Sequence, residues 1–178
     1  MTTKKTPKAT FSWIDVKTHL ADFDRAGLLG LVQDLYAASK DNKAFLHARF
    51  GLGDDPLEPY KDVITCWINP PDFRNPISVS KAKKALGKPE GLAELTVFYC
   101  EEVFDFLADC GMDDEGFYDA LVRMFEQALK YVLALPTAQQ AAFLTRLDRV
   151  RRLGKNIGWG VGDDFNHFWS EAGLAGQA

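Results

Sequence analysis

Apolar residues recur at steps of three and four along most of this chain, which is the spacing of one face of an α-helix. The pattern is clearest in residues 92–110, where one continuous apolar stripe contains Leu92, Leu95, Tyr99, Val103, Phe106 and Cys110. A second stripe follows in residues 117–133, with Phe117, Leu121, Met124, Phe125, Ala128, Val132 and Leu133. No segment alternates convincingly between apolar and polar residues, so the pattern predicts an all-α fold.

Residues that begin or end helices divide this pattern into separate elements. Asp113 is placed to cap the second of these helices, and Pro136 ends it. Thr137 and Gln140 have the spacing of a capping box and predict a third helix, which runs to Gly154. The links between the three helices are short, so we expect them to pack as an antiparallel set.

The N-terminal half predicts shorter helices. Ser12 caps one that runs to about residue 22, and Asp24 caps another that runs to about residue 39. The polar run at 39–42 then predicts a tight corner in which Asp41 caps a helix over 42–50. Pro56 opens a helix that reaches about residue 68, and the proline-rich residues 69–76 predict a loop.

These elements add up to an antiparallel helical bundle of seven to nine helices, with a short irregular α-solenoid as the alternative. We expect one domain over 10–170, made of an N-terminal half (10–70) and a C-terminal half (77–154). Residues 1–9 are basic and polar and predict a disordered tail, and residues 171–178 predict a flexible one.

Composition and charge narrow the class of protein. The chain has 178 residues, of which 47% are apolar, enough for one sizeable core. The formal net charge of −4 argues against bulk electrostatic attraction to nucleic acid or anionic lipid, and no apolar run is long enough to span a membrane. The three cysteines are odd in number and widely spaced, as expected of reduced thiols in a cytoplasmic protein: Cys66, Cys100 and Cys110.

Two segments carry a resemblance to a known family. "LVQDLYAASKDNKAFLHARF" and, after a gap, "SVSKAKKAL" resemble a family of uncharacterised all-helical bacterial proteins, known only as a domain of unknown function. The resemblance extends over about residues 25–135. It implies a helical fold and a bacterial cytoplasmic origin, and it implies no activity, cofactor or site residue.

A basic segment precedes the helix at 92–110. Lys81, Lys84 and Lys88 lie on one face of a short predicted helix, with Ser78 at its start and Arg74 close by. Free backbone amides and the helix dipole favour anions at such a start. The segment is therefore a candidate contact for an anion or nucleic acid, and the alternative is an ordinary solvated or internally paired face.

An acidic stripe lies on the helix that follows, formed by Glu94, Glu101, Asp105 and Asp109. Like charges at helical spacing destabilise a helix, by about 0.2–0.5 kcal/mol per pair. We therefore expect cations opposite the stripe, and Lys81 and Lys84 are the nearest along the chain. This internal charge seam is the favoured interpretation, and an interaction face for a basic partner is the alternative.

The C-terminal segment combines glycines with aromatic residues. Residues 158–164, "GWGVGDD", predict a hinge in which Asp163 or Asp164 caps a last helix. That helix presents Phe165, Phe168 and Trp169 on one side. Such a cluster either docks on its own domain or forms an arm that docks on a neighbouring subunit or partner.

The sequence contains no pattern typical of catalysis or of a metal site. His19, His47 and His167 are scattered, and no pair of cysteines has ligand spacing. We therefore expect no enzyme activity and no cofactor. The favoured function is a cytoplasmic protein-interaction or adaptor module whose partner is a protein, with a homodimer as one option. A nucleic-acid-associated protein is the second hypothesis.

Overall fold

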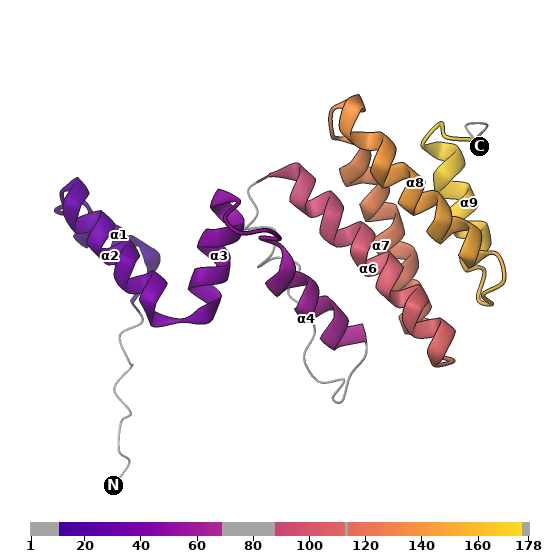
Figure 1. Cartoon of the computed structure of the whole chain (residues 1–178), viewed down its shortest axis with the longest axis horizontal. Helices are drawn as coiled ribbons and strands as arrows, with labels where there is room; N and C mark the ends of the chain where they lie inside the picture. Colours follow the sequence, from indigo (N-terminus) through magenta and orange to yellow (C-terminus); the bar gives the residue numbers. More distant parts are fainter. Residues whose placement is uncertain (1–10, 69–87, 113, 176–178) are drawn as a thin grey trace, which may run out of the picture. The chain divides into compact units, whose positions relative to one another are not determined.

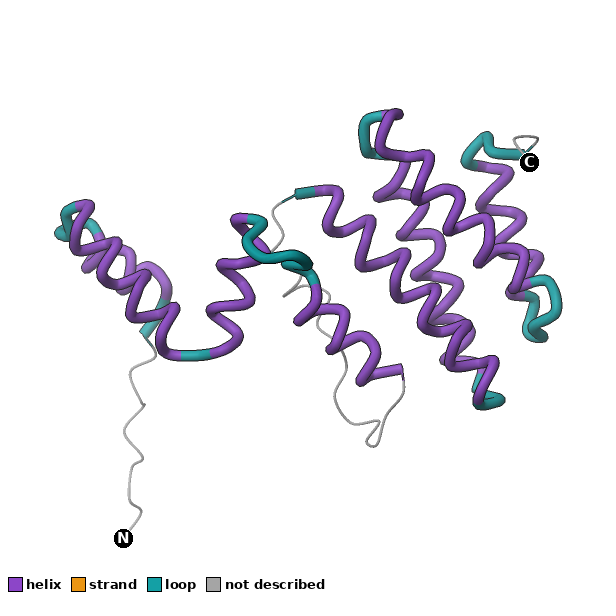
Figure 2. Tube along the Cα trace, in the orientation of Figure 1, coloured by secondary structure: helices purple, strands orange, loops and turns teal. Residues whose placement is uncertain are grey.

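The computed structural model describes residues 11–68, 88–112 and 114–175, apart from the side chain of Trp67. All regular structure in these ranges is helical, which confirms the predicted all-α fold (Figures 1 and 2). The helices are α1 (Trp13–Leu20), α2 (Arg25–Ala38), α3 (Lys40–Phe50), α4 (Glu58–Ile68), α6 (Pro89–Asp109), α7 (Glu115–Leu133), α8 (Thr137–Gly154) and α9 (Val161–Glu171). The predicted tail at 1–9, the loop at 69–76 and most of the basic helix at 78–88 lie outside the described residues.

The chain divides into two compact units, Met1–Lys43 and Ala44–Ala178. The sequence predicted one domain over 10–170, whereas the boundary between these units falls within α3. Unit 1 contains α1, α2 and the first turn of α3. Unit 2 contains the rest of α3 and all the later helices.

Unit 1 contains two helices joined by a short turn, which we call the hairpin, and both helices begin where their capping residues predict. At the start of α1, the Ser12 backbone N–H and hydroxyl both donate to the Asp15 carboxylate, at 2.7 and 2.8 Å. At the start of α2, the Asp24 carboxylate accepts a 2.7 Å hydrogen bond from the backbone N–H of Gly27. Neither helix has a buried residue, so the hairpin has no hydrophobic core of its own.

The corner between α2 and α3 lies where the sequence predicted it, but its capping residue differs. The Ser39 hydroxyl accepts a 3.1 Å hydrogen bond from the backbone N–H of Asn42. The Asn42 side chain donates to the carbonyl of Leu35 at 2.6 Å and so satisfies the end of α2. Because Ser39 already occupies the capping position, α3 begins at Lys40, and Asp41 lies in its first turn rather than before it.

Unit 2 is built from helices that pack side by side (Figure 1). Helix α6 packs against α4, α7 and α8, and α9 packs against α7 and α8. Consecutive helices α6 to α9 are joined by short links, so each neighbouring pair forms a hairpin. Both architectures predicted from the sequence, a bundle and a short solenoid of hairpins, contain such neighbours.

The core of unit 2 follows the two predicted apolar stripes. On α6, Leu95, Tyr99, Val103 and Phe106 are buried, whereas Leu92 is half-buried and Cys110 is exposed. On α7, the buried residues include Leu121, Phe125, Ala128 and Val132. Full burial of a large apolar side chain stabilises a fold by about 1.5–3 kcal/mol, so these stripes hold α6 and α7 together.

Two predicted caps in unit 2 are not the ones that form. The start of α7 is capped by Asp114, which accepts from the backbone N–H of Phe117 at 2.8 Å, while Asp113 lies outside the described residues. Helix α8 begins at Thr137 itself, so Thr137 cannot act as its cap. The Gln140 side chain instead donates to the carbonyl of Leu135 at 2.7 Å.

The glycine-rich link between α8 and α9 allows a close helix contact. A Cβ atom on Gly162 would lie 2.9 Å from the carbonyl oxygen of Gly154, so the backbones of α8 and α9 approach closely here. Gly160 adopts a left-handed conformation (φ +74°) at the cap of α9, and neither Asp163 nor Asp164 caps the helix.

The residues that follow α9 are packed rather than free. Leu174 is buried, and its carbonyl accepts a 3.2 Å hydrogen bond from the indole N–H of Trp169. Leu174 is therefore not part of a free tail, because its apolar side chain packs against the core of unit 2, and the rest of the predicted flexible tail at 171–178 stays a prediction. Residues 176–178 lie outside the described part.

Candidate interaction surfaces

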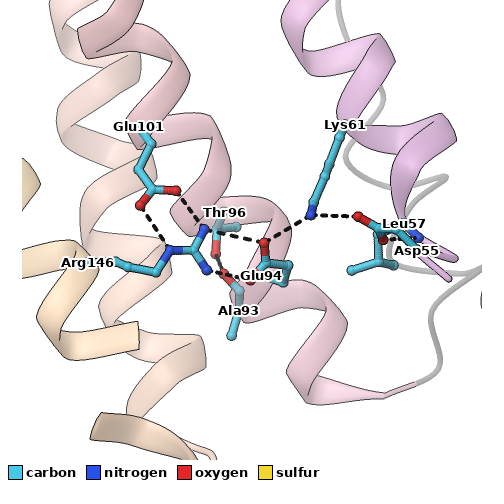
Figure 3. Close-up of polar contacts among 8 residues, drawn as sticks. All are labelled: Asp55, Leu57, Lys61, Ala93, Glu94, Thr96, Glu101 and Arg146. Carbon is cyan, nitrogen blue, oxygen red and sulfur yellow. Dashed lines mark hydrogen bonds and ion pairs between the residues drawn. The ribbon is translucent and has the colours of Figure 1, made fainter. Parts of the chain in front are cut away.

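Five charged side chains from α4, α6, α8 and the turn before α4 form a continuous network, which we call the charge seam: Asp55, Lys61, Glu94, Glu101 and Arg146 (Figure 3). Glu94 and Glu101 are seven residues apart on α6, so they point to the same side of the helix. Arg146 of α8 lies between them, and Lys61 approaches Glu94 from α4 (Figure 3).

The guanidinium of Arg146 bonds both carboxylates at once. Its Nε and Nη2 donate to Glu101 at 2.9 and 2.6 Å, and its Nη1 and Nη2 donate to Glu94 at 2.5 and 3.3 Å. A planar guanidinium with several fixed donors suits such paired contacts. Lys61 completes the charge seam, with its Nζ atom 3.2 Å from Glu94 and 2.9 Å from Asp55.

The proton affinities in the charge seam reflect these contacts. Burial alone would raise the pKa of Glu94, but Arg146 and Lys61 outweigh burial and hold this pKa below its ordinary value. Hydrogen bonds to Glu101 and then Glu94 raise the pKa of Arg146 against the effect of burial. Lys61, through a hydrogen bond and its charge, lowers the pKa of Asp55.

This geometry changes the interpretation of the acidic stripe. Glu94 and Glu101 are part of an internal charge seam, as the favoured interpretation expected, and not of a free acidic face. Their described partners are Arg146 and Lys61, which reach them because α8 and α4 both lie against α6. Pairing with Lys81 and Lys84 stays a prediction, because both lysines lie outside the described residues.

The remaining half of the acidic stripe stays on the surface. Asp105 and Asp109 are exposed at the C-terminal end of α6. Glu102, at the edge of the stripe, accepts a 2.7 Å hydrogen bond from the hydroxyl of Thr65 on α4. Only Asp105 and Asp109 of the four predicted acidic residues are therefore available to a partner.

The structure describes one residue of the predicted basic surface. Lys88 is exposed at the N-cap of α6, but its side chain makes no capping hydrogen bond. The other four residues lie outside the described part of the chain: Arg74, Ser78, Lys81 and Lys84. The anion or nucleic-acid contact therefore stays a prediction.

The predicted docking arm docks on its own unit. Phe165 is fully buried and stacks on Phe125 of α7, with ring centroids 4.0 Å apart. Phe168 and Trp169 are half-buried, and the guanidinium of Arg151 lies 5.3 Å from the centre of a Trp169 ring. The idea of a free aromatic arm is therefore wrong, because Phe165 fills the centre of the core of unit 2.

Of the sixteen large apolar side chains that are exposed in the described part of the chain, nine lie on unit 1, and the sequence did not single them out. We call these nine the hairpin surface, which consists of Phe11, Trp13, Ile14, Val16, Phe23, Leu28, Leu29, Val32 and Leu35. Their exposed fractions range from 40% at Leu28 to 85% at Phe11. On α2, Leu28, Val32 and Leu35 are four and three residues apart, which is the spacing of one face. This spacing indicates an apolar face on α2, but it does not show whether another part of the protein covers that face.

Within residues 11–68, 88–112 and 114–175, no cluster of three histidine, cysteine or acidic side chains is arranged to hold a metal ion. Over the same ranges, no helix has both the length and the apolar character of a membrane span.

Comparisons with protein families, with curated proteins and with solved structures find no match to this chain. The resemblance to helical bacterial proteins stays a prediction. The features of this chain that bear on its function are the surfaces described above.

Proposed function

We propose that this chain is a non-catalytic protein-interaction or adaptor module of the bacterial cytoplasm, and that the hairpin surface on unit 1 is the part that binds. The observation that carries the proposal is the exposure of nine large apolar side chains on a hairpin without a buried residue. Soluble proteins rarely leave contiguous apolar patches uncovered, and large ones are typical of sites that bind another protein.

The two units differ in how well they bury their own apolar residues, and this difference supports the assignment of binding to unit 1. Unit 2 buries Phe125, Phe165 and Leu121 completely and places an ion-pair network across its helices, so it can fold around its own core. Unit 1 has apolar residues in helical register, and within its described residues, 11–43, no other side chain buries them. In this proposal unit 2 is the scaffold and unit 1 is the binding element.

The test compares two matched double variants in affinity capture after cross-linking in cells. Leu28→Ser/Leu35→Ser alters the hairpin surface at residues that are 40% and 50% exposed. Leu133→Ser/Leu153→Ser makes the same change on unit 2, at residues that are 38% and 49% exposed. We expect the unaltered chain and the unit 2 variant to retain the same protein, whether another copy or a different chain, and the hairpin variant to lose it. Equal retention by all three would refute the proposal.

A further inference from the structure

The hairpin of unit 1 is too small to be stable by itself. Helix α1 has eight residues and α2 has fourteen, and neither contains a buried residue. Isolated helices shorter than about 12–15 residues are marginal in water, and most helical stability in proteins comes from packing of the apolar face. The well-capped helices of this hairpin therefore need a surface that covers Leu28, Val32 and Leu35.

The exposed apolar side chains of the hairpin surface together have the area of a specific protein interface. A whole aromatic side chain buries about 150–250 Å² and an aliphatic one somewhat less, so the exposed fractions correspond to roughly 900 Å² on one copy. A standard stable interface buries about 800 Å² on each partner. A twofold interface that covers most of these side chains therefore reaches the area of a stable dimer.

The charges around the hairpin surface favour another copy of the same hairpin. Residues 11–43 contain five acidic side chains and four lysines or arginines: Asp15, Asp22, Asp24, Asp34 and Asp41, with Lys17, Arg25, Lys40 and Lys43. Residues 44–178 contain twenty acidic side chains and fourteen lysines or arginines. Two copies that meet through unit 1 therefore avoid the repulsion that two acidic units would experience.

We infer that a second copy of this chain covers the hairpin surface, so that two hairpins pack about a twofold axis as a four-helix bundle. This inference rests on the proposed function and names its partner. Apolar stripes from two identical hairpins can satisfy each other, because a twofold interface brings the same surface of both copies together. The stripe formed by Leu28, Val32 and Leu35 supplies the central contact of that bundle.

The test measures dimerisation of the purified full-length chain by sedimentation equilibrium. We expect a reversible dimer for the unaltered chain. Leu28→Ser/Leu35→Ser removes four leucine side chains from a twofold interface, two from each copy, and raises the dimer dissociation constant at least about a hundredfold. Leu133→Ser/Leu153→Ser changes it less than about threefold. Circular dichroism and urea unfolding of each variant check that unit 2 stays folded.

Several outcomes would overturn the inference. The inference is wrong if the unaltered chain stays monomeric up to about 100 µM. It is also wrong if the Leu28→Ser/Leu35→Ser variant still forms the same dimer. If the chain is monomeric and the hairpin amides still exchange slowly at every protein concentration, another part of the same chain covers the hairpin surface.

The same measurements separate this inference from the proposed function. If the chain is monomeric and cellular capture of a different protein still depends on Leu28 and Leu35, the proposed function stands and only the inference that the partner is a second copy is wrong. If capture does not depend on these leucines either, both proposals fail.

Discussion

Replacing Arg146 by methionine removes the cation at the centre of the charge seam and keeps an unbranched, flexible side chain in place of the aliphatic part of arginine. Arg146, Glu94 and Glu101 have 31%, 21% and 30% of their side chains exposed, so all three are largely withdrawn from water. After Arg146→Met, Glu101 loses the partner it has in the charge seam, and Glu94 keeps Lys61. The two carboxylates, about two turns apart on α6, then repel each other with less positive charge nearby to offset the repulsion.

The expected loss lies between two known limits. Exposed ion pairs contribute about 0.2–1 kcal/mol, and removal of one partner from a buried pair costs about 3–5 kcal/mol. The partial exposure of this site places the loss at about 2 kcal/mol of the free energy of unfolding. For a chain of this size that lowers Tm by about 4–8 °C.

The pH dependence gives a second, independent signature. The folded pKa of Glu94 lies below its ordinary value of 4.5, so its ion pairs stabilise the fold above that pH. This contribution is lost as the pH falls through the lowered pKa, because the carboxylate becomes protonated. The difference between the unaltered chain and Arg146→Met is therefore largest at neutral pH and shrinks below about pH 4.5.

Urea unfolding at pH 7 and at acidic pH measures both quantities. Arg149→Met is the matched control, since Arg149 is exposed on the same helix, and its expected effect is within about 0.5 kcal/mol. A double-mutant cycle with Glu101→Gln isolates the coupling between Arg146 and Glu101. A loss no larger than that of the control would show that the charge seam does not stabilise unit 2. A larger loss that does not change with pH would show that ionised Glu94 does not contribute to it.

Three further predictions test the packing of unit 2. Gly162→Ala places a Cβ atom 2.9 Å from backbone atoms of α8 and destabilises the fold by about 1–3 kcal/mol in urea unfolding, whereas Gly158→Ala, with no atom within 4 Å, is close to neutral. Phe165→Ala removes a fully buried ring and costs about 3–5 kcal/mol; a cost below 1 kcal/mol would mean that α9 does not complete the core. Cys100 is buried and burial raises its thiol pKa, so a thiol reagent modifies it only after denaturation, while it modifies two exposed thiols in the native chain: Cys66 and Cys110.

The sequence predicts helix ends well where one capping residue stands alone. Ser12 and Asp24 cap α1 and α2 as expected. The prediction fails at Asp41 because Ser39, two positions earlier, is also a good capping residue and is the one that caps α3. At Thr137 it fails because the helix begins one residue too early for a capping box.

The candidate surfaces are harder to predict, because they depend on contacts between distant helices. The acidic stripe on α6 indicates that cations must lie opposite it, but Arg146 is 52 residues from Glu94 along the chain. Spacing within one helix cannot identify such a partner. The hairpin surface is missed for a related reason, since a period of 3.6 residues marks an apolar face and carries no information about what covers it.

The stacking of Phe165 on Phe125 has a consequence for synthesis on the ribosome. Forty residues separate the two rings, and at roughly 5–20 residues per second α9 is translated about 2–8 s after the middle of α7. During that interval α6, α7 and α8 can associate, but the ring of Phe125 has no aromatic cover. The nascent chain therefore exposes an incomplete core together with the earlier hairpin, and both are surfaces that a chaperone would recognise.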